Sequence, residues 1–428
     1  MLWSPAARPG YLDTSPTHSG TRGKSILMKI KFVDLFSQNQ EIRERVEHDL
    51  ADLHRKTAYI GGEYVSSFEE EFAAFVGVKR AIGVGSGTDA LRLTLLALGI
   101  GPGDEVITTP MTFIATAAAI LQSGATPVFA DIDLATGNLD PRAVQRYLAA
   151  GNFRSPNGPK AILPVHLYGS PAPVDALAKL AKEHHLYLVE DACQAHGARV
   201  LSGEQWRSAG SFGIGACFSF YPGKNLGAWG EAGAVVTDDD DLADQVVALR
   251  DHGRISHYAH DRIGYNARLD ALQALVLRAK LARLPDWNAR RRQIANEYRE
   301  LLRDSGISFV VEPEGAQSCY HLFVVRSEAR DLIRGELLSR EIECGIHYPV
   351  PVHLQPACAS LGYKPGDFPV SERFADTIVS LPMHPHLRSA DLTSVTQAVH
   401  AALDRNSGLL AGGYRLSDSV APPLANGN

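Results

Sequence analysis

Short apolar runs alternate with amphipathic stretches over the first two thirds of the chain. The runs are rich in Val, Ile, Leu and Ala, which is typical of strands that are buried on both faces. They cover residues 81–84, 105–108, 126–131, 161–166, 186–190, 216–220 and 234–237. Residues 88–98, 114–123 and 174–184 instead carry apolar side chains at helical spacing. This alternation predicts an α/β domain of three layers, with helices on both faces of a mostly parallel sheet.

Two helices are expected before the first strand. Residues 41–56 repeat apolar side chains along one helical face. A turn is expected at Gly61 and Gly62, which can adopt backbone angles that other residues avoid. Ser67 then has the pattern of a helix start, because Glu70 follows three residues later as in a capping box.

The pattern changes after residue 269. One long helix is predicted over residues 269–302, with a kink at Pro285, because proline breaks the hydrogen bonding of a helix interior. Shorter elements follow, such as a strand at 320–325 and a helix at 329–340, which is typical of a smaller α+β domain.

The chain is therefore expected to form two domains between two tails. We predict a large domain over residues 29–275 and a small C-terminal domain over residues 276–405. Residues 1–28 and 406–428 are rich in small and polar residues and are expected to be disordered. Met28 is an alternative start of the chain.

Composition narrows the classes of function. The 428 residues carry a formal net charge of -6, which provides no basic surface for nucleic acid. The five cysteines form no CxxC pair, so we expect neither a disulfide framework nor a metal site, and we expect a cytoplasmic location. No apolar run approaches the ~18 residues that span a bilayer, so no membrane partner is expected.

Two residues carry the strongest chemical signal. Asp191 follows the apolar run 186–190, and Lys224 lies in a glycine-flanked loop after the run 216–220. Burial lowers the pKa of a lysine, which frees its amine for Schiff-base chemistry. A carboxylate beside a pyridine nitrogen keeps that nitrogen protonated. Together these residues predict an enzyme that uses pyridoxal phosphate (PLP), although each alone is also compatible with a loop lysine or a strand-end acid.

Other residues of the same region fit a phosphorylated ring. The turn at Gly87 and Thr88 lies between a predicted strand and a predicted helix, where backbone amides and a hydroxyl can bind phosphate. Ser219 can reach the same phosphate, Gln194 can donate to a ring oxygen, and Phe113 can stack on a flat ring. A purely structural turn and an ordinary core aromatic are the alternatives for the turn and for Phe113.

Three features leave alternatives open. His196 is either part of the site or a packed, hydrogen-bonded side chain. Cys193 is expected to be a small packed residue rather than a reactive thiol. The glycines between residues 83 and 87 imitate part of a dinucleotide fingerprint but lack its full spacing, so a dinucleotide oxidoreductase remains a rival class.

Several motifs, in the right order, resemble the DegT/StrS-type sugar aminotransferases. These are PLP enzymes of the aspartate aminotransferase fold, so the resemblance implies a three-layer PLP-transferase large domain. It covers about residues 32–403 and rests on the segments 85–91, 103–106, 112–116, 164–169, 190–197, 218–225 and 264–270. Cys193 departs from the common form, which has a second alanine at this position.

The resemblance implies a role for each candidate that faces the ring. Lys224 would be the Schiff-base lysine and the acid and base of the reaction. Asp191 would pair with the pyridine nitrogen, and Gln194 would donate to the ring hydroxyl oxygen. Phe113 would stack on the ring. Because relatives with histidine at the position of Lys224 are dehydratases, the lysine favours a transaminase.

The resemblance also implies the phosphate site. Gly87, Thr88 and Ser219 would bind the phosphate within one subunit. Asn266, which alone indicates only a loop before a helix, would reach the phosphate of the neighbouring subunit. This role implies a homodimer.

The implied substrates are a nucleotide-linked keto-sugar and an amino donor, either glutamate or glutamine. The segments 250–253 and 257–261 resemble the branch that aminates 3-keto sugars, so we expect a 3-keto rather than a 4-keto sugar. The segment 345–355 is expected to line the sugar side. The alternatives are a cyclitol or aminobenzoate-type substrate, and a non-catalytic protein with a sensory or regulatory role, against which the retained PLP residues argue.

Overall fold

The computed structural model of the chain describes residues 29–411, and their side chains up to residue 406. The predicted tail at 1–28 lies outside the described residues, as do residues 412–428 of the second tail. α12 (Ser389–Ala411) continues past residue 405, so the start of the second tail is helical rather than disordered.

A seven-stranded sheet forms the centre of the described fold, in the order β1-β9-β8-β5-β4-β2-β3. β9 (Gly233–Thr237) is antiparallel to both of its neighbours, and the remaining strands run parallel to one another. They are β1 (Arg80–Val84), β2 (Glu105–Thr108), β3 (Thr126–Phe129), β4 (Pro159–Ile162), β5 (Tyr187–Asp191) and β8 (Gly215–Ser219). The predicted α/β class with a mostly parallel sheet is confirmed.

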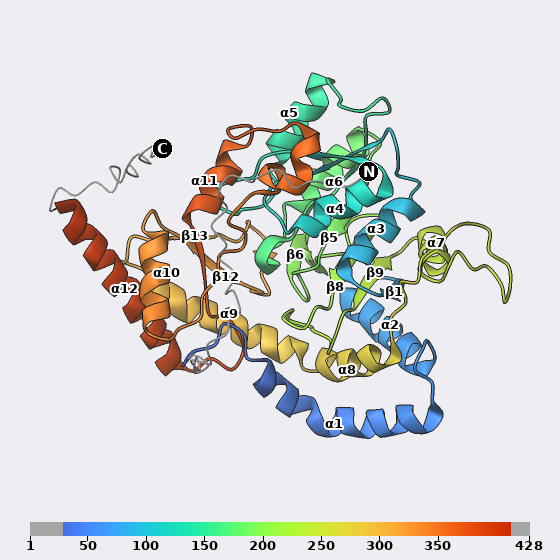
Figure 1. The fold of residues 1–428 in the computed structure, drawn as a ribbon, viewed down its shortest axis with the longest axis horizontal. Coiled ribbons are helices and arrows are strands. Elements are labelled where there is room, and N and C mark those ends of the chain that lie inside the picture. Colours follow the sequence, from blue (N-terminus) through green and yellow to red (C-terminus); the bar gives the residue numbers. More distant parts are fainter. Residues whose placement is uncertain (1–28, 412–428) are drawn as a thin grey trace, which may run out of the picture.

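Helices cover both faces of this sheet (Figure 1). Successive strand residues point to opposite faces, so Ala81 packs in one apolar core and Ile82 in another. The core of Ile82 lies under α3 (Gly87–Ala97), α4 (Ile114–Ser123) and α7 (Asp240–Arg250). The opposite face is covered by α1 (Leu35–Lys56), α2 (Glu63–Val76), α5 (Pro141–Ala150), α6 (Val174–Glu183) and α8 (Ala271–Leu281). These are the predicted three layers.

The first two helices begin earlier than the sequence predicts. α1 begins at Leu35, because the carboxylate of Asp34 caps it by accepting from the Ser37 amide at 3.3 Å. α2 begins directly after Gly62, whose φ of +74° ends the preceding turn. The predicted capping box at Ser67 is therefore wrong, because this serine lies inside a helix that has already started.

The long helix predicted after residue 269 is two helices. α8 ends at Leu281, and α9 (Leu284–Leu301) begins three residues later. Pro285 lies in the first turn of α9, where its missing N–H leaves no helical hydrogen bond unmade. The proline therefore starts a new helix rather than kinking an existing one.

The C-terminal part of the chain builds a smaller α+β unit. β10 (Ser308–Phe309), β12 (Phe323–Arg326) and β13 (Ile378–Leu381) form an antiparallel sheet. α9, α10 (Arg330–Ser339) and α12 pack on it, at the end of the molecule away from α7 (Figure 1). Ile30 also packs in this core and pairs with Ile342. The first described residues therefore belong to the C-terminal unit. The predicted boundary between residues 275 and 276 stays a prediction.

The remaining elements are short and join these two units. β6 (Arg199–Ser202), β7 (Gln205–Ser208) and β11 (Ala316–Gln317) form a small antiparallel sheet. α11 (Pro369–Thr377) directly precedes β13. Within residues 29–411, no helix is long and apolar enough to cross a membrane.

Replacing Phe72 by Ala tests the packing of α2 on the sheet. The Phe72 ring is fully buried, and it meets Phe218 and Phe220 edge to face at centroid distances of 5.0 and 5.2 Å. We expect the free energy of unfolding, measured in urea at fixed protein concentration, to fall by about 3–5 kcal/mol. The control, Phe36→Ala, removes a ring that is 67% exposed in α1 and is expected to change it by less than about 0.5 kcal/mol.

Candidate active site

A cavity of about 840 Å³ opens where β1, β5 and β8 end. These strands are parallel, so their carboxyl ends meet at one edge of the sheet, as is usual for ligand sites in such folds. Its lining includes Gly87, Thr88, Phe113, Asp191, Gln194, Ser219 and Lys224. The structure thus brings together all of the predicted site residues except Asn266.

Lys224 enters the cavity from the loop after β8. Its backbone amide donates to the Tyr221 carbonyl at 2.8 Å in a tight turn, which aims the side chain inward. Its amine makes no hydrogen bond or ion pair in the part of the chain that the structure describes. Burial lowers the pKa of Lys224 below the usual lysine value, with a smaller opposing effect from Asp191. A larger fraction of the amine is therefore neutral and nucleophilic near neutral pH.

The carboxylate of Asp191 is held from two sides. Its Oδ2 accepts from the Thr116 hydroxyl at 2.8 Å, and its Oδ1 accepts from the Cys193 amide at 3.2 Å. The Thr112 hydroxyl supports that of Thr116 at 2.8 Å. Each carboxylate oxygen has two acceptor sites, so Asp191 can still accept a hydrogen bond from a ring N–H in the cavity.

Gln194 lies three residues beyond Asp191, and its amide group is oriented at both ends. Its Oε1 accepts from the Tyr168 amide at 2.7 Å, and its Nε2 donates to the Tyr348 hydroxyl at 3.0 Å. An amide nitrogen carries two hydrogens, so one N–H of Gln194 remains for a ligand oxygen.

Glycine at position 87 is required by close packing at the start of α3. A Cβ on Gly87 would lie 2.5 Å from the Ser219 Cβ and 3.1 Å from the Cys193 sulfur. The side chain of Ser86 caps α3 by accepting from the Asp89 amide at 3.0 Å. The N-terminal amides of α3 and the hydroxyls of Thr88 and Ser219 therefore border one side of the cavity, where they can bind an anion.

Phe113 marks the outer rim of the cavity. It is the N-cap residue of α4, its ring is 52% exposed, and it lies 5.7 Å from the Tyr348 ring. The predicted alternative of an ordinary core aromatic is wrong, because a core ring would be buried. A half-exposed aromatic face beside Lys224 and Asp191 is available to stack on a flat ligand.

Several residues that line the cavity were not predicted from the sequence. Thr116 was missed, although a threonine pair four residues apart at a helix start was a usable signal. His321 gave no signal at all. His347 and Tyr348 lie in the expected segment 345–355 and do line the cavity. Farther along that segment, His353 is buried and bonds to Glu372 at 3.1 Å instead.

Burial indicates whether His196 belongs to the site and whether Cys193 is a reactive thiol. His196 lies wholly buried between the rings of Phe218 and Phe220, and burial lowers its pKa to about 3. It is a packed, neutral side chain that does not line the cavity. Neither of its ring nitrogens has a hydrogen-bond partner within the described residues, so the expected hydrogen bonding of this histidine is not found. Cys193 lines the cavity, but burial raises the pKa of its thiol well above the usual range. This supports the prediction that Cys193 is not a reactive thiol.

Two predicted regions face away from the cavity within a single chain. Asn266 is exposed, and its side-chain oxygen accepts from the Arg268 guanidinium at 3.1 Å. Arg250, in the segment taken as a sign of sugar preference, donates to the Gly83 carbonyl at 2.6 Å and to Glu69. Arg250 therefore holds β1 in place, and it does not line the cavity of this subunit.

The cavity fits PLP on the chemistry of its side chains. It offers an unpaired lysine amine for the aldehyde, a carboxylate for the pyridine nitrogen and a donor amide for the ring oxygen. It also offers a helix N-terminus for the phosphate. Within residues 29–411, no cluster of three or more His, Cys, Asp and Glu side chains could hold a metal ion. The fold and the site together define a PLP-dependent transferase.

The comparisons with known proteins identify the family. A sequence model of the DegT/DnrJ/EryC1/StrS aminotransferase family matches residues 40–400. The chain therefore belongs to this family, it is a PLP-dependent aminotransferase, and the resemblance found in the sequence is confirmed. The match with each of the following relatives extends over nearly the whole length of that relative.

The dTDP-3-amino-3,4,6-trideoxy-alpha-D-glucose transaminase of Streptomyces venezuelae is 43% identical, over 88% of this chain and 97% of the relative. The UDP-N-acetyl-3-dehydro-alpha-D-glucosamine 3-aminotransferase of Acidithiobacillus ferrooxidans is 39% identical, over 87% and 98%. The crystal structure of S. venezuelae DesV in complex with a ketimine intermediate superposes with a TM-score of 0.83 at 43% identity, covering 88% of this chain and 99% of that one.

Replacing Gly87 by Ala tests the proposed phosphate site. The added methyl group would collide with Ser219 and narrow the approach to the α3 amides. We expect the dissociation constant for PLP, measured by fluorescence on cofactor-free protein, to rise by about tenfold or more, which corresponds to ~1.4 kcal/mol. Gly335→Ala is the control, because that helical glycine has open space around its Cβ position and lies outside the cavity. Unchanged PLP affinity in Gly87→Ala would place the phosphate elsewhere.

The lowered pKa of Lys224 predicts how its reactivity depends on pH. Only the neutral amine is nucleophilic, so acetylation of Lys224 by acetic anhydride should reach its maximal rate at a lower pH than that of a free lysine side chain. Peptide mass spectrometry of cofactor-free protein at a series of pH values measures this rate. The midpoint is expected below 10.5, the usual lysine value, and a midpoint at or above 10.5 would contradict the effect of burial.

Proposed function

We propose that this enzyme transfers an amino group from glutamate or glutamine to C3 of a nucleotide-linked keto-sugar. The observation that carries the transaminase chemistry is the convergence of Lys224, Asp191 and Gln194 on one cavity. The choice of C3 is supported by the two relatives above, whose names share amination at C3 and differ in the nucleotide. The nucleotide of this enzyme's own substrate is therefore left open, and the cytoplasmic location remains a prediction.

Each cavity residue has a distinct part in the proposed reaction. When bound, PLP supplies an electron sink for the negative charge that develops beside the nitrogen of the substrate. The Nζ of Lys224 takes the proton from Cα of the amino donor, and in the second half of the cycle it delivers a proton to C3 of the sugar. The Asp191 carboxylate keeps the ring nitrogen protonated, and Gln194 donates to the ring oxygen. His347 and Tyr348 border the space left for the sugar.

Replacing Lys224 by Ala is expected to abolish turnover, because no other amine lines the cavity in the described part of the chain. The loss should be at least about 10²–10⁴-fold, the usual contribution of a general acid or base. Release of 2-oxoglutarate from glutamate measures the first half of the cycle without any sugar. Lys280→Ala is the control, since Lys280 is buried but lies outside the cavity. Persisting turnover in Lys224→Ala would refute the mechanism.

The position of amination needs a separate screen. Matched 3-keto and 4-keto sugars carrying dTDP or UDP are offered to the enzyme after its first half-reaction, and the products are assigned by NMR. The proposal expects a 3-amino product with at least one nucleotide. Exclusive formation of a 4-amino sugar, or of an aminated cyclitol, would refute the proposed substrate class. The proposed transaminase chemistry would still stand.

We also propose that two copies share each active site through Asn266. In one chain this side chain is exposed, and two apolar residues that precede it in the sequence, Tyr258 and Ile263, are 89% and 91% exposed. Apolar side chains so exposed in one loop indicate a surface that another copy covers. In the proposed dimer, Asn266 of one copy binds the phosphate of the cofactor in the other copy.

Mixing two inactive variants tests this shared site. Lys224→Ala lacks the amine, and Asn266→Ala is expected to bind the cofactor weakly. A mixed dimer restores one complete site, with Lys224 from one chain and Asn266 from the other. Activity is therefore expected to reappear after the two variants are unfolded and refolded together, with a dimer mass in light scattering. No recovery from a confirmed mixed dimer would show that Asn266 acts within its own chain or not at all.

A further inference from the structure

Glu190 is a carboxylate that the proposed chemistry does not use. It precedes Asp191 on β5, and neighbouring residues of a strand point to opposite faces, so Glu190 lies on the side away from the cavity. Its side chain is fully buried. A buried charge is costly unless it is bonded, so its partners indicate what the site requires.

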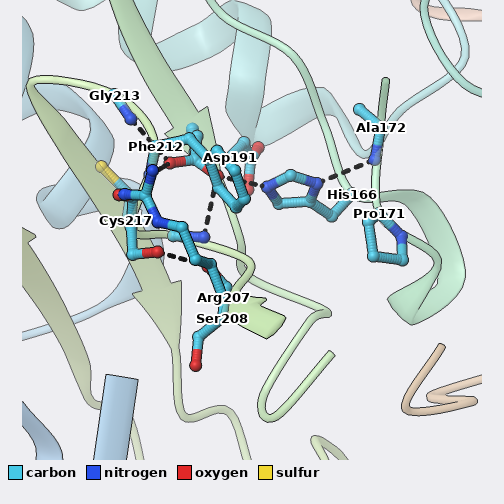
Figure 2. A network of polar contacts seen from close by, with 12 residues as sticks. His166, Pro171, Ala172, Asp191, Arg207, Ser208, Phe212, Gly213 and Cys217 are labelled. Carbon is cyan, nitrogen blue, oxygen red and sulfur yellow. Dashed lines mark hydrogen bonds and ion pairs between the residues drawn. The ribbon is translucent and has the colours of Figure 1, made fainter. Parts of the chain in front are cut away.

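Every acceptor position of Glu190 is used, and three of its partners, His166, Phe212 and Gly213, are labelled in Figure 2. Its Oε1 accepts from the amides of Phe212 at 2.7 Å and Gly213 at 2.9 Å. Its Oε2 accepts from the Gly210 amide at 2.8 Å and from His166 Nε2 at 3.0 Å. Burial alone would raise the pKa of Glu190, but these hydrogen bonds lower it overall, so the group stays ionised.

The same network fixes the ring of His166. Its Nδ1 accepts from the Ala172 amide at 2.9 Å (Figure 2). The proton of the neutral ring therefore lies on Nε2, which donates to Glu190. The imidazole therefore connects the end of β5 to the turn over residues 166–172.

That turn holds both residues proposed to face the cofactor ring. The His166 amide donates to the Asp191 carbonyl at 3.0 Å, and the Asp191 amide donates to the Pro164 carbonyl at 2.9 Å. Two residues on, the Tyr168 amide donates to the Gln194 Oε1 at 2.7 Å. Tyr168 has a φ of +61°, an unfavourable angle for a residue with a side chain, which persists only where surrounding bonds enforce it.

We propose that Glu190 and His166 act as a positioning pair, which sets the placement of Asp191 and Gln194 against the cofactor ring. The proposal rests on the proposed function, because it assigns the pair to the same cavity. The pair never touches the substrate. It fastens the turn that holds the main chain of Asp191 and the amide of Gln194, where a displacement of 1 Å can reduce a rate by about 10²-fold.

Two substitutions of His166 separate its two bonds. The amide nitrogen of His166→Gln reaches the position of Nε2 and can still donate to Glu190. The amide oxygen of His166→Asn reaches the position of Nδ1, so it can accept from Ala172 but cannot reach Glu190. The matched control is His353→Asn, because His353 is also buried and bonds to a glutamate, Glu372, that accepts further amides, yet it lies outside the cavity.

The readouts are PLP affinity, the visible absorbance of the PLP-loaded protein, and kcat and KM for glutamate, with thermal stability alongside. For His166→Asn we expect a loss of PLP affinity and of kcat of about 10–100-fold, the usual range for groups that orient a ligand-binding residue, and a displaced absorbance maximum. KM should change much less. His166→Gln should remain close to the wild type, and His353→Asn should lose thermal stability alone.

Two results would overturn the positioning role. One is that His166→Asn matches His353→Asn in all cofactor readouts, which would make the pair purely structural. The other is that His166→Gln is as impaired as His166→Asn, which would exclude the bond to Glu190 as the cause. If His166→Asn does not fold, His166→Gln is the variant that tests the proposal, because the bond to Glu190 is the side-chain contact that it retains. Impaired PLP binding and kcat in His166→Gln would then overturn the positioning role. Failure of the wild-type protein to bind PLP would instead refute the proposed function.

Discussion

The pairing of β5 with β8 is the interaction on which the rest of the site depends. In this parallel ladder Asp191 lies opposite Cys217, so both strands end at the same edge of the sheet. The chain that leaves β5 supplies Gln194, and the chain that leaves β8 supplies Ser219 and Lys224. Residues distant in sequence therefore meet in one cavity without any long side chain having to reach across.

Two kinds of burial act on the two sides of this edge. On the cavity side, the half-buried amine of Lys224 makes no hydrogen bond or ion pair within the described residues, and burial lowers its pKa, which prepares it for covalent chemistry. On the opposite side, the carboxylate of Glu190 is buried with every acceptor position filled. The unpaired group is reactive and the fully paired group is rigid, and one β-strand separates the two environments.

The sequence was sufficient for the α/β class, for the strands of the central sheet and for most of the candidate site, because these depend on local patterns. The helices α5, α7 and α12 were not predicted. Strand-end acids and glycine turns at carboxyl ends are visible as residue spacing, which is how Asp191, Gly87 and Lys224 were found. Helix starts were missed where a cap such as Asp34 or Gly62 outweighed a more obvious pattern. His321 and the partners of Glu190 at 210–213 come from loops whose position depends on tertiary packing. The proposed role of Asn266 involves a second chain, which lies outside the structure of one chain.

The proposed function depends above all on covalent binding of PLP by Lys224. Reduction of the cofactor-loaded protein with sodium borohydride makes this bond permanent, and peptide mass spectrometry then locates it. One modified site is expected, on the peptide that contains Lys224. Modification of Lys280 instead would contradict the assignment of Lys224, since burial also lowers the pKa of Lys280, to about 8, but Lys280 lies outside the cavity. The absence of any modified lysine would contradict it equally.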